Sequence, residues 1–122
     1  MIAGGSVTIY VSDMERAVRF YTETLGLRLM YRGGPDYAAV DAGKGLELGL
    51  HAVHPGGPRP GPGGGMQLSL TVTEPIGEVV AALRARGVAV EDPRPGGGPI
   101  TLAALGDPDG NPIVLIEVKS GP

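Results

Sequence analysis

One pattern of elements occurs twice in the sequence, and this repeat limits the fold more than any other feature. An alternating apolar stretch at 6–11 has its counterpart at 67–72, which indicates two half-buried strands. Each stretch precedes a segment with apolar residues at helical spacing, and each of these segments stops at a glycine. Val11 and Val72 lie 61 residues apart, as do Gly26 and Gly87. A constant offset across strand, helix and helix end indicates a true internal repeat.

Each copy of the repeat is predicted to form a βαβββ module, so the fold class is α+β. The first helix has Ser12 or Asp13 as its cap, with Glu15 completing a capping box, and the second helix begins near Pro75. Three strands are expected after each helix, at 27–32, 37–41 and 46–51, and at 88–90, 100–105 and 113–118. A ferredoxin-like sandwich is the alternative, but three strands after each helix are more than that fold uses.

The chain length of 122 residues suits a single domain covering 1–122. The first module is expected at about 4–53 and the second at about 66–119. Between them, residues 54–65 read HPGGPRPGPGGG and are predicted to be a hinge. The chain has 22 glycines and 12 prolines, a level found in disordered chains. Because the excess is concentrated in this hinge and in residues 94–99, we predict loops rather than disorder.

Composition excludes several kinds of function. The net charge of −3 and the scattered basic residues argue against nucleic acid as a partner. The absence of cysteine excludes disulfides, thiolate metal sites and cysteine nucleophiles. No apolar run reaches the roughly 18 residues of a membrane span, so no membrane partner is expected. The N-terminal residues do not follow the pattern of a signal peptide, and we expect a cytoplasmic protein.

Two motifs at opposite ends of the repeat carry a family resemblance. The first is Val11-Ser12-Asp13 followed by a helix that ends Phe20-Tyr21-Thr22-Glu23-Thr24-Leu25-Gly26-Leu27. The second is the turn Asp107-Pro108-Asp109-Gly110-Asn111-Pro112 before the last strand. With both motifs, the chain resembles the glyoxalase/bleomycin resistance protein/dioxygenase (vicinal oxygen chelate) superfamily from about Ser6 to Val118. The resemblance implies two tandem βαβββ modules that form a curled mixed sheet around a cavity.

The resemblance also implies four possible metal-ligand positions, on the first and last strands of the modules. In this sequence we match them to Ser6, Glu47, Gln67 and Val114. Three of these are not the usual His or Glu, so the set is a poor metal site and we expect no metal and no cofactor. If the protein is metal-dependent, one divalent ion would bind through Glu47 and Gln67. The only histidines, His51 and His54, lie past the usual position, and a weak Glu47–His51 site stays open.

Strand parity predicts which side chains face the cavity. The face opposite the helices carries Ser6, Thr8 and Tyr10 in one module, Gln67, Ser69 and Thr71 in the other, joined by Glu47, Gly49, His51 and Val114. From these we expect the ligand-binding residues to be Thr8, Tyr10, Glu47, His51, Gln67 and Ser69. Tyr31 and Tyr37 are further aromatic candidates. Glu47 is the only candidate catalytic base if it is desolvated, or else a relic bonded to Ser6 or Gln67.

Three functions remain open from the sequence. The first is a metal-independent small-molecule binding protein for resistance or sequestration, with a small organic ligand, although the few aromatic residues argue against bleomycin itself. The second is a metal-dependent lyase, isomerase, dioxygenase or transferase of the same superfamily, and the third is a structural dimer with no ligand. We lean away from an enzyme because of Ser6, Gln67 and Val114. A homodimer is expected, either side by side or with modules exchanged, and the hinge could instead form a flap with Arg59 at its tip.

Overall fold

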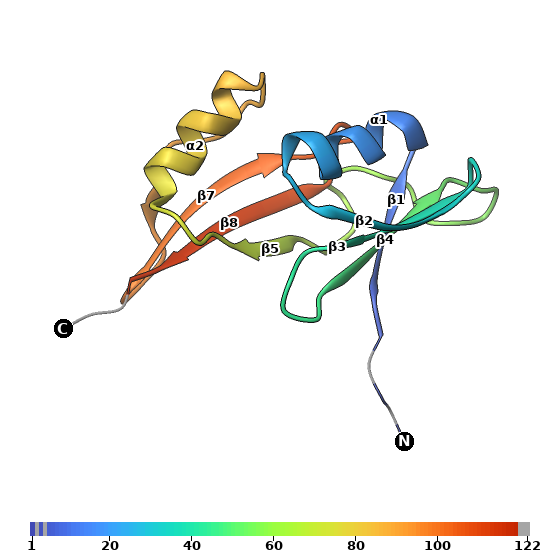
Figure 1. Cartoon of the computed structure of the whole chain (residues 1–122), viewed down its shortest axis with the longest axis horizontal. Helices are drawn as coiled ribbons and strands as arrows, with labels where there is room; N and C mark the ends of the chain where they lie inside the picture. Colours follow the sequence, from blue (N-terminus) through green and yellow to red (C-terminus); the bar gives the residue numbers. More distant parts are fainter. Residues whose placement is uncertain (2, 4, 120–122) are drawn as a thin grey trace. The chain divides into compact units, whose positions relative to one another are not determined.

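The computed structural model describes residues 1, 3 and 5–119 of the chain. The expected start of the first module at residue 4 lies outside the described residues. The chain divides into two compact units, Met1–Gly64 and Gly65–Pro122. Each unit contains an open four-stranded sheet and a helix (Figure 1).

The first unit has the predicted order of one strand, one helix and three strands. Strand β1 (Val7–Val11) leads into α1 (Met14–Arg19), and β2 (Arg28–Gly33), β3 (Tyr37–Asp41) and β4 (Glu47–Ala52) follow. The strand order in the sheet is β1-β4-β3-β2. Strands β1 and β4 are parallel, and the other pairs are antiparallel. The long connection through α1, β2 and β3 lets β1 and β4 run in the same direction.

The helix of the first unit departs from the sequence prediction at both ends. Asp13 caps it by accepting a hydrogen bond from the Arg16 amide at 3.1 Å. The predicted capping box is wrong because Glu15 lies one position too early for it, and the Glu15 carboxylate pairs with Arg32 instead. After Arg19 the helix widens into a π-helical segment, η1 (Phe20–Thr24). The left-handed Gly26, with φ of 77°, follows that segment as predicted.

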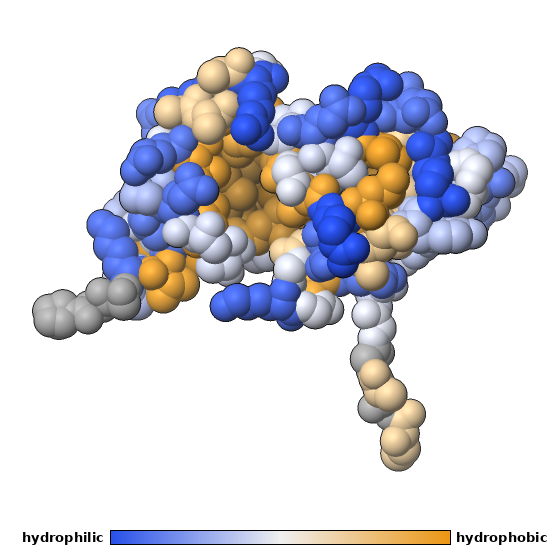
Figure 2. All heavy atoms as spheres, viewed as in Figure 1, coloured by the Kyte–Doolittle hydropathy of each residue, from blue (hydrophilic) through white to orange (hydrophobic). Residues whose placement is uncertain are grey.

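The core of the first unit lies between α1 and one face of the sheet. Helix α1 covers β3 and β4 (Figure 1). The buried side chains of this layer are Val11, Met14, Ala17, Phe20, Tyr21, Ala38, Val40, Leu48 and Leu50. Hydrophilic residues cover the outward side of α1, where they are blue in Figure 2. Since α1 covers only one face of the sheet, the opposite face of this unit has no helix over it.

The second unit repeats the arrangement with one strand displaced. It contains β5 (Leu68–Thr71), α2 (Ile76–Ala85), β6 (Arg94–Pro95), β7 (Ile100–Gly106) and β8 (Pro112–Val118), with the strand order β5-β8-β7-β6. The predicted strand at 88–90 is wrong, and the edge strand lies at Arg94–Pro95, within a stretch predicted to be loop. The Arg84 guanidinium donates to the Val90 carbonyl at 2.7 and 3.2 Å. A side chain therefore takes the acceptor that a neighbouring strand would otherwise use.

Among the helices of residues 5–119, none has the length and apolar character needed to cross a membrane.

The turn between β7 and β8 is held by one buried carboxylate. The carboxylate of Asp107 accepts hydrogen bonds from the Asp109 and Asn111 amides, both at 2.9 Å, and from the Asn111 side chain at 2.8 Å. Gly110 supplies the positive φ, 81°, that closes the turn. The motif at 107–112 thus has a local structural role, because it forms the tight turn between two antiparallel strands.

Replacement of Asp107 by alanine is expected to lower the free energy of unfolding by about 2–3 kcal/mol, because it leaves three donors without their charged acceptor. Urea denaturation followed by circular dichroism measures the change. Asp92→Ala is the control, since the Asp92 carboxylate is exposed and bonds the exposed Arg84 side chain. It should change stability by less than about 0.5 kcal/mol. Equal effects of the two substitutions would contradict the assigned role of Asp107.

Candidate ligand-binding site

The exposed face of the first sheet carries four of the six predicted ligand-binding residues. In the parallel β1–β4 pair, Tyr10 is the register partner of His51, and Thr8 is the partner of Gly49. Side chains alternate along a strand, so Thr8, Tyr10, Glu47 and His51 share the face opposite the helix. Thr8 is exposed, and the other three are half-buried. The sequence prediction of which residues share this face agrees with the observed register.

A continuous series of rings crosses this face. The Tyr10 and His51 ring centroids are 5.2 Å apart, those of His51 and Tyr37 are 6.3 Å apart, and those of Tyr37 and Tyr31 are also 6.3 Å apart. All three contacts are tilted or edge-on, the geometries that aromatic quadrupoles favour. We call these four residues, from β1, β4, β3 and β2, the aromatic row. It offers both ring surface and polar ring atoms to a ligand.

Gly49 makes room for part of the aromatic row. A Cβ atom at Gly49 would lie 2.8 Å from the Tyr37 hydroxyl and 3.1 Å from Tyr37 Cε1. The Tyr37 ring therefore lies over the backbone of β4, where any larger residue at 49 would displace it. The sequence signal for this contact was a lone glycine inside a strand next to a tyrosine-bearing strand.

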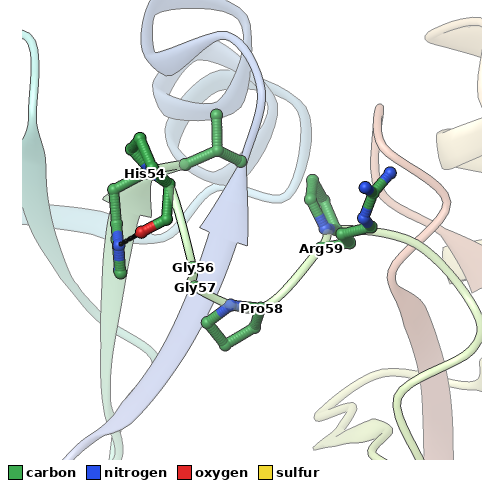
Figure 3. Close-up of a pocket in the computed structure, with 8 residues that line it drawn as sticks. His54, Gly56, Gly57, Pro58 and Arg59 are labelled. Atoms are coloured by element: carbon green, nitrogen blue, oxygen red, sulfur yellow. Dashed lines mark hydrogen bonds between the residues drawn. The ribbon is translucent and has the colours of Figure 1, made fainter.

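The loop after β4 adds a hollow beside the aromatic row. Residues 53–60 line an open hollow of about 420 Å³, shown in Figure 3. Its volume is in the range of ligand-binding pockets. The His54 ring belongs to both features, since its centroid is 5.7 Å from that of Tyr10 and 5.7 Å from that of His51. Arg59 also lines this hollow and is exposed.

Glu47 lies away from the aromatic row, at the start of β4. Its register partner on β3 is Asp41, another acid. Among residues 5–119, the Glu47 carboxylate has no hydrogen-bond or ion-pair partner, and the predicted bond to Ser6 is absent. Glu47 and His51 are four residues apart on one strand, about 13 Å along it. A single metal ion cannot bind both side chains at that separation.

Strand register also changes the matched set of metal-ligand positions. In the first unit Val7 pairs with Leu48, and in the second Leu68 pairs with Ile113. Because Val7 and Leu68 are repeat counterparts, the counterpart of Val114 is Gly49, and the counterpart of Glu47 is Pro112. The pairing of Glu47 with Val114 predicted from sequence is therefore wrong by two residues.

The corrected positions do not fit a bound metal ion. With Val114 kept as the position that the turn at 107–112 indicates, they are Ser6 and Gly49 in the first unit and Gln67 and Val114 in the second, with no carboxylate or imidazole among them. Across the described residues, no three His, Cys, Asp or Glu side chains lie close enough to hold a metal ion. Gln67 lies just before β5 and Ser69 lies within it, opposite Val114, and both are exposed. These two predicted ligand-binding residues share one face of the second unit.

Asp41 is a site residue that sequence reasoning missed. Its carboxylate accepts from the Gly43 amide at 2.7 Å and from the Arg28 guanidinium at 2.9 Å. These hydrogen bonds, the Gly43 amide foremost, hold the pKa of the Asp41 carboxyl below its ordinary value of 3.8. Arg28 and Asp41 are register partners, so Arg28, Asp41 and Glu47 form a charged row across the same face. The sequence signal was Asp-x-Gly, a turn in which Asp bonds its own backbone.

Comparisons with known proteins agree with the fold. The sequence model of the Glyoxalase/Bleomycin resistance protein/Dioxygenase superfamily matches residues 5–115. Among solved structures, TnmS3, an antibiotic binding protein from Streptomyces sp. CB03234, is 31% identical with a TM-score of 0.80, and the match covers 98% of each chain. A superfamily member from Sphaerobacter thermophilus is 28% identical with a TM-score of 0.80, covering 96% of this chain and 98% of that one.

A further structure, a glyoxalase/bleomycin resistance protein from Streptomyces sp. CB03234, is 31% identical with a TM-score of 0.73, and the match covers 93% of this chain and 98% of that one. No match was found among curated proteins.

Arg28→Gln is expected to raise the pKa of Asp41 toward its ordinary value, because it removes one of the donors to the carboxylate. Carboxyl ¹³C NMR titration measures this pKa. A lowered pKa stabilises the fold above the ordinary pKa, and this stabilisation is lost as the pH falls through the lowered value. Acid should therefore destabilise the wild type more than Arg28→Gln.

Arg32→Gln is the control, since Arg32 bonds Gly34 and Glu15. An unchanged Asp41 pKa in Arg28→Gln would contradict the assignment.

Proposed function

Because this chain belongs to the glyoxalase/bleomycin resistance protein/dioxygenase superfamily, we propose that it is a metal-independent binding protein for a small organic molecule. The observation that carries the proposal is the aromatic row on the uncovered face of the first sheet. Binding for resistance or sequestration needs a surface that holds a ligand, and it needs no reacting group.

The chemistry of the aromatic row favours a flat ligand with polar edges. Ring faces stack on planar molecules, and such contacts contribute roughly 0.5–1.5 kcal/mol each beyond area burial. The phenol groups of Tyr10 and Tyr37 and the His51 ring can form hydrogen bonds with the ligand's polar edges. The charged row of Arg28, Asp41 and Glu47 crosses the same face. The similarity to an antibiotic binding protein over nearly the whole chain supports a ligand of the antibiotic kind.

Metal independence rests on the residues at the four family positions. Ser6, Gly49, Gln67 and Val114 provide one hydroxyl and one amide as donors. Catalytic metal sites generally use three protein ligands, so these residues favour binding over metal-dependent catalysis.

Tyr10→Ala and Tyr37→Ala are each expected to weaken ligand binding by about fivefold or more, because each removes one stacking surface. Ligands are first found by thermal shift with a panel of planar aromatic antibiotics of different charge, bleomycin included, on protein treated with a chelator. A bound ligand raises the melting temperature. Calorimetry then gives the affinities of the variants.

Glu78→Ala, an exposed change on α2 in the second unit, is the matched control and should bind as the wild type does. Binding that requires added Zn²⁺, Ni²⁺, Mn²⁺ or Fe²⁺ would contradict metal independence. No ligand from the panel, or equal binding by all variants, would argue against the aromatic row and favour a structural role.

We also propose that the protein forms a homodimer through the edge strand β2. This strand exposes three successive large side chains, Leu29, Met30 and Tyr31, at 42, 46 and 60% of their surface. The β2–β3 register shifts between Leu29 and Tyr31, so Met30 lies at a bulge. Exposed apolar residues on an edge strand are suited to contact another chain. Exchange of modules through residues 54–65 is the other arrangement.

Met30→Glu is expected to convert the dimer to a monomer, because it places a charge in the apolar contact. Sedimentation equilibrium at micromolar concentration gives the mass. Val118→Glu, which changes a comparably exposed side chain at the end of β8, is the matched control and should remain dimeric. A monomeric wild type would overturn the dimer, and a dimeric Met30→Glu would overturn the β2 contact.

A further inference from the structure

We propose that His51 and His54 form a transition-metal site of two imidazoles, for Cu²⁺, Ni²⁺ or Zn²⁺, where β4 enters the loop. The site goes beyond the proposed ligand binding, which requires no metal. It also differs from the family positions, because His51 lies two residues after Gly49 and His54 lies in the loop.

The two rings lie at the separation that one metal ion needs. Their centroids are 5.7 Å apart and their planes are inclined by 72°. An ion bonded tetrahedrally to one nitrogen of each ring at about 2.1 Å holds the two centroids roughly 5 Å apart. The observed separation of 5.7 Å is close to that value. His51 and His54 are the only histidines, and the chain has no cysteine, so the imidazole ligands preferred by these metals occur only here.

In both rings the hydrogen bond involves Nδ1, so Nε2 is the nitrogen that can donate an electron pair to a metal. His51 Nδ1 lies 2.7 Å from the Ala52 carbonyl oxygen, and His54 Nδ1 lies 3.3 Å from that of Pro55. Figure 3 shows the second of these as a dashed line. In the tautomer that donates from Nδ1 to these carbonyl oxygens, Nε2 of each neutral ring keeps its lone pair. A metal-binding histidine commonly donates its other nitrogen to a backbone carbonyl in this way.

The surroundings hold both rings near each other. His51 is half-buried, with the Tyr10 and Tyr37 rings against it. The His54 ring lies over Gly57, where a Cβ atom would be 2.4 Å from His54 Cε1 and 2.5 Å from Nε2. The Gly57 amide also donates to the His54 carbonyl at 3.0 Å, closing the turn. Glycine at 57 therefore lets the loop fold back against the ring.

Two imidazoles leave the other coordination positions to water or to donor atoms of a bound molecule. Such a site binds less tightly than a structural site with four protein ligands. Among divalent metals of the first transition row, Cu²⁺ is expected to bind tightest. The site would place a Lewis acid at the end of the aromatic row, beside the Tyr10 ring.

The test is titration of the full-length chain, without a histidine tag and after chelator treatment, with Cu²⁺ alone. We expect one Cu²⁺ per chain, with electron paramagnetic resonance showing coupling to imidazole nitrogen. His51→Gln and His54→Gln should each weaken binding about tenfold or more. Gly57→Ala should also weaken it while both histidines remain, because its Cβ displaces the His54 ring.

Glu23→Gln is the matched control, since it removes an exposed carboxylate from η1 of the same unit. It should leave Cu²⁺ affinity unchanged. Binding that persists in both histidine variants, as at the N-terminal amine, would overturn the site. Loss of binding in only one histidine variant would overturn the chelate of two rings. Because His54 is exposed on a loop, His54→Gln tests the site even if His51→Gln does not fold.

Discussion

The parallel pairing of β1 with β4 determines what the first unit can do. The register fixes Tyr10 beside His51 and Thr8 beside Gly49 on one face, and it fixes Val11, Leu48 and Leu50 on the other. Helix α1 covers the apolar face and removes it from water. A slip of one residue would reverse both faces, bury the polar side chains and expose the core. The hydrophobic core therefore holds the aromatic row in place. The row itself lies on the opposite face of the sheet from the core.

Sequence patterns predicted the two faces of these strands because the cause of the alternation is local. The alternation in 6–11 and the helix end at Gly26 are properties of short segments. Both features occur again in the second copy of the repeat, at 67–72 and Gly87. The π-helical segment and the displaced β6 could not be read in the same way. The first accompanies a hydrogen bond from the Thr22 hydroxyl to the Val18 carbonyl, and the second depends on Arg84 reaching Val90. Both are side-chain contacts with the backbone, and residue periodicity does not report such contacts.

The candidate site shows the same division between local pattern and contact. Parity placed Thr8, Tyr10 and His51 on one face correctly. Parity could not show that Gly49, and not Glu47, is the counterpart of Val114, because that equivalence depends on the relative register of β1 with β4 and of β5 with β8. The corrected equivalence leaves glycine at the counterpart of Val114. The Tyr37 ring occupies the space next to that glycine, so this position is part of the aromatic surface.

The loop after β4 carries the His54 ring, which lies beside the aromatic row. The glycines and prolines of this loop predict a hinge. Gly57 also has a specific role, because it leaves room for the His54 ring beside Tyr10 and His51. A molecule that contacts Tyr10 therefore also meets a ring carried by the loop. Any ligand or ion that binds His54 must restrict the loop, and the free energy lost in ordering it is set by the loop's length and glycine content. The affinity of a ligand bound here would therefore depend on loop order as well as on contacts with the aromatic row.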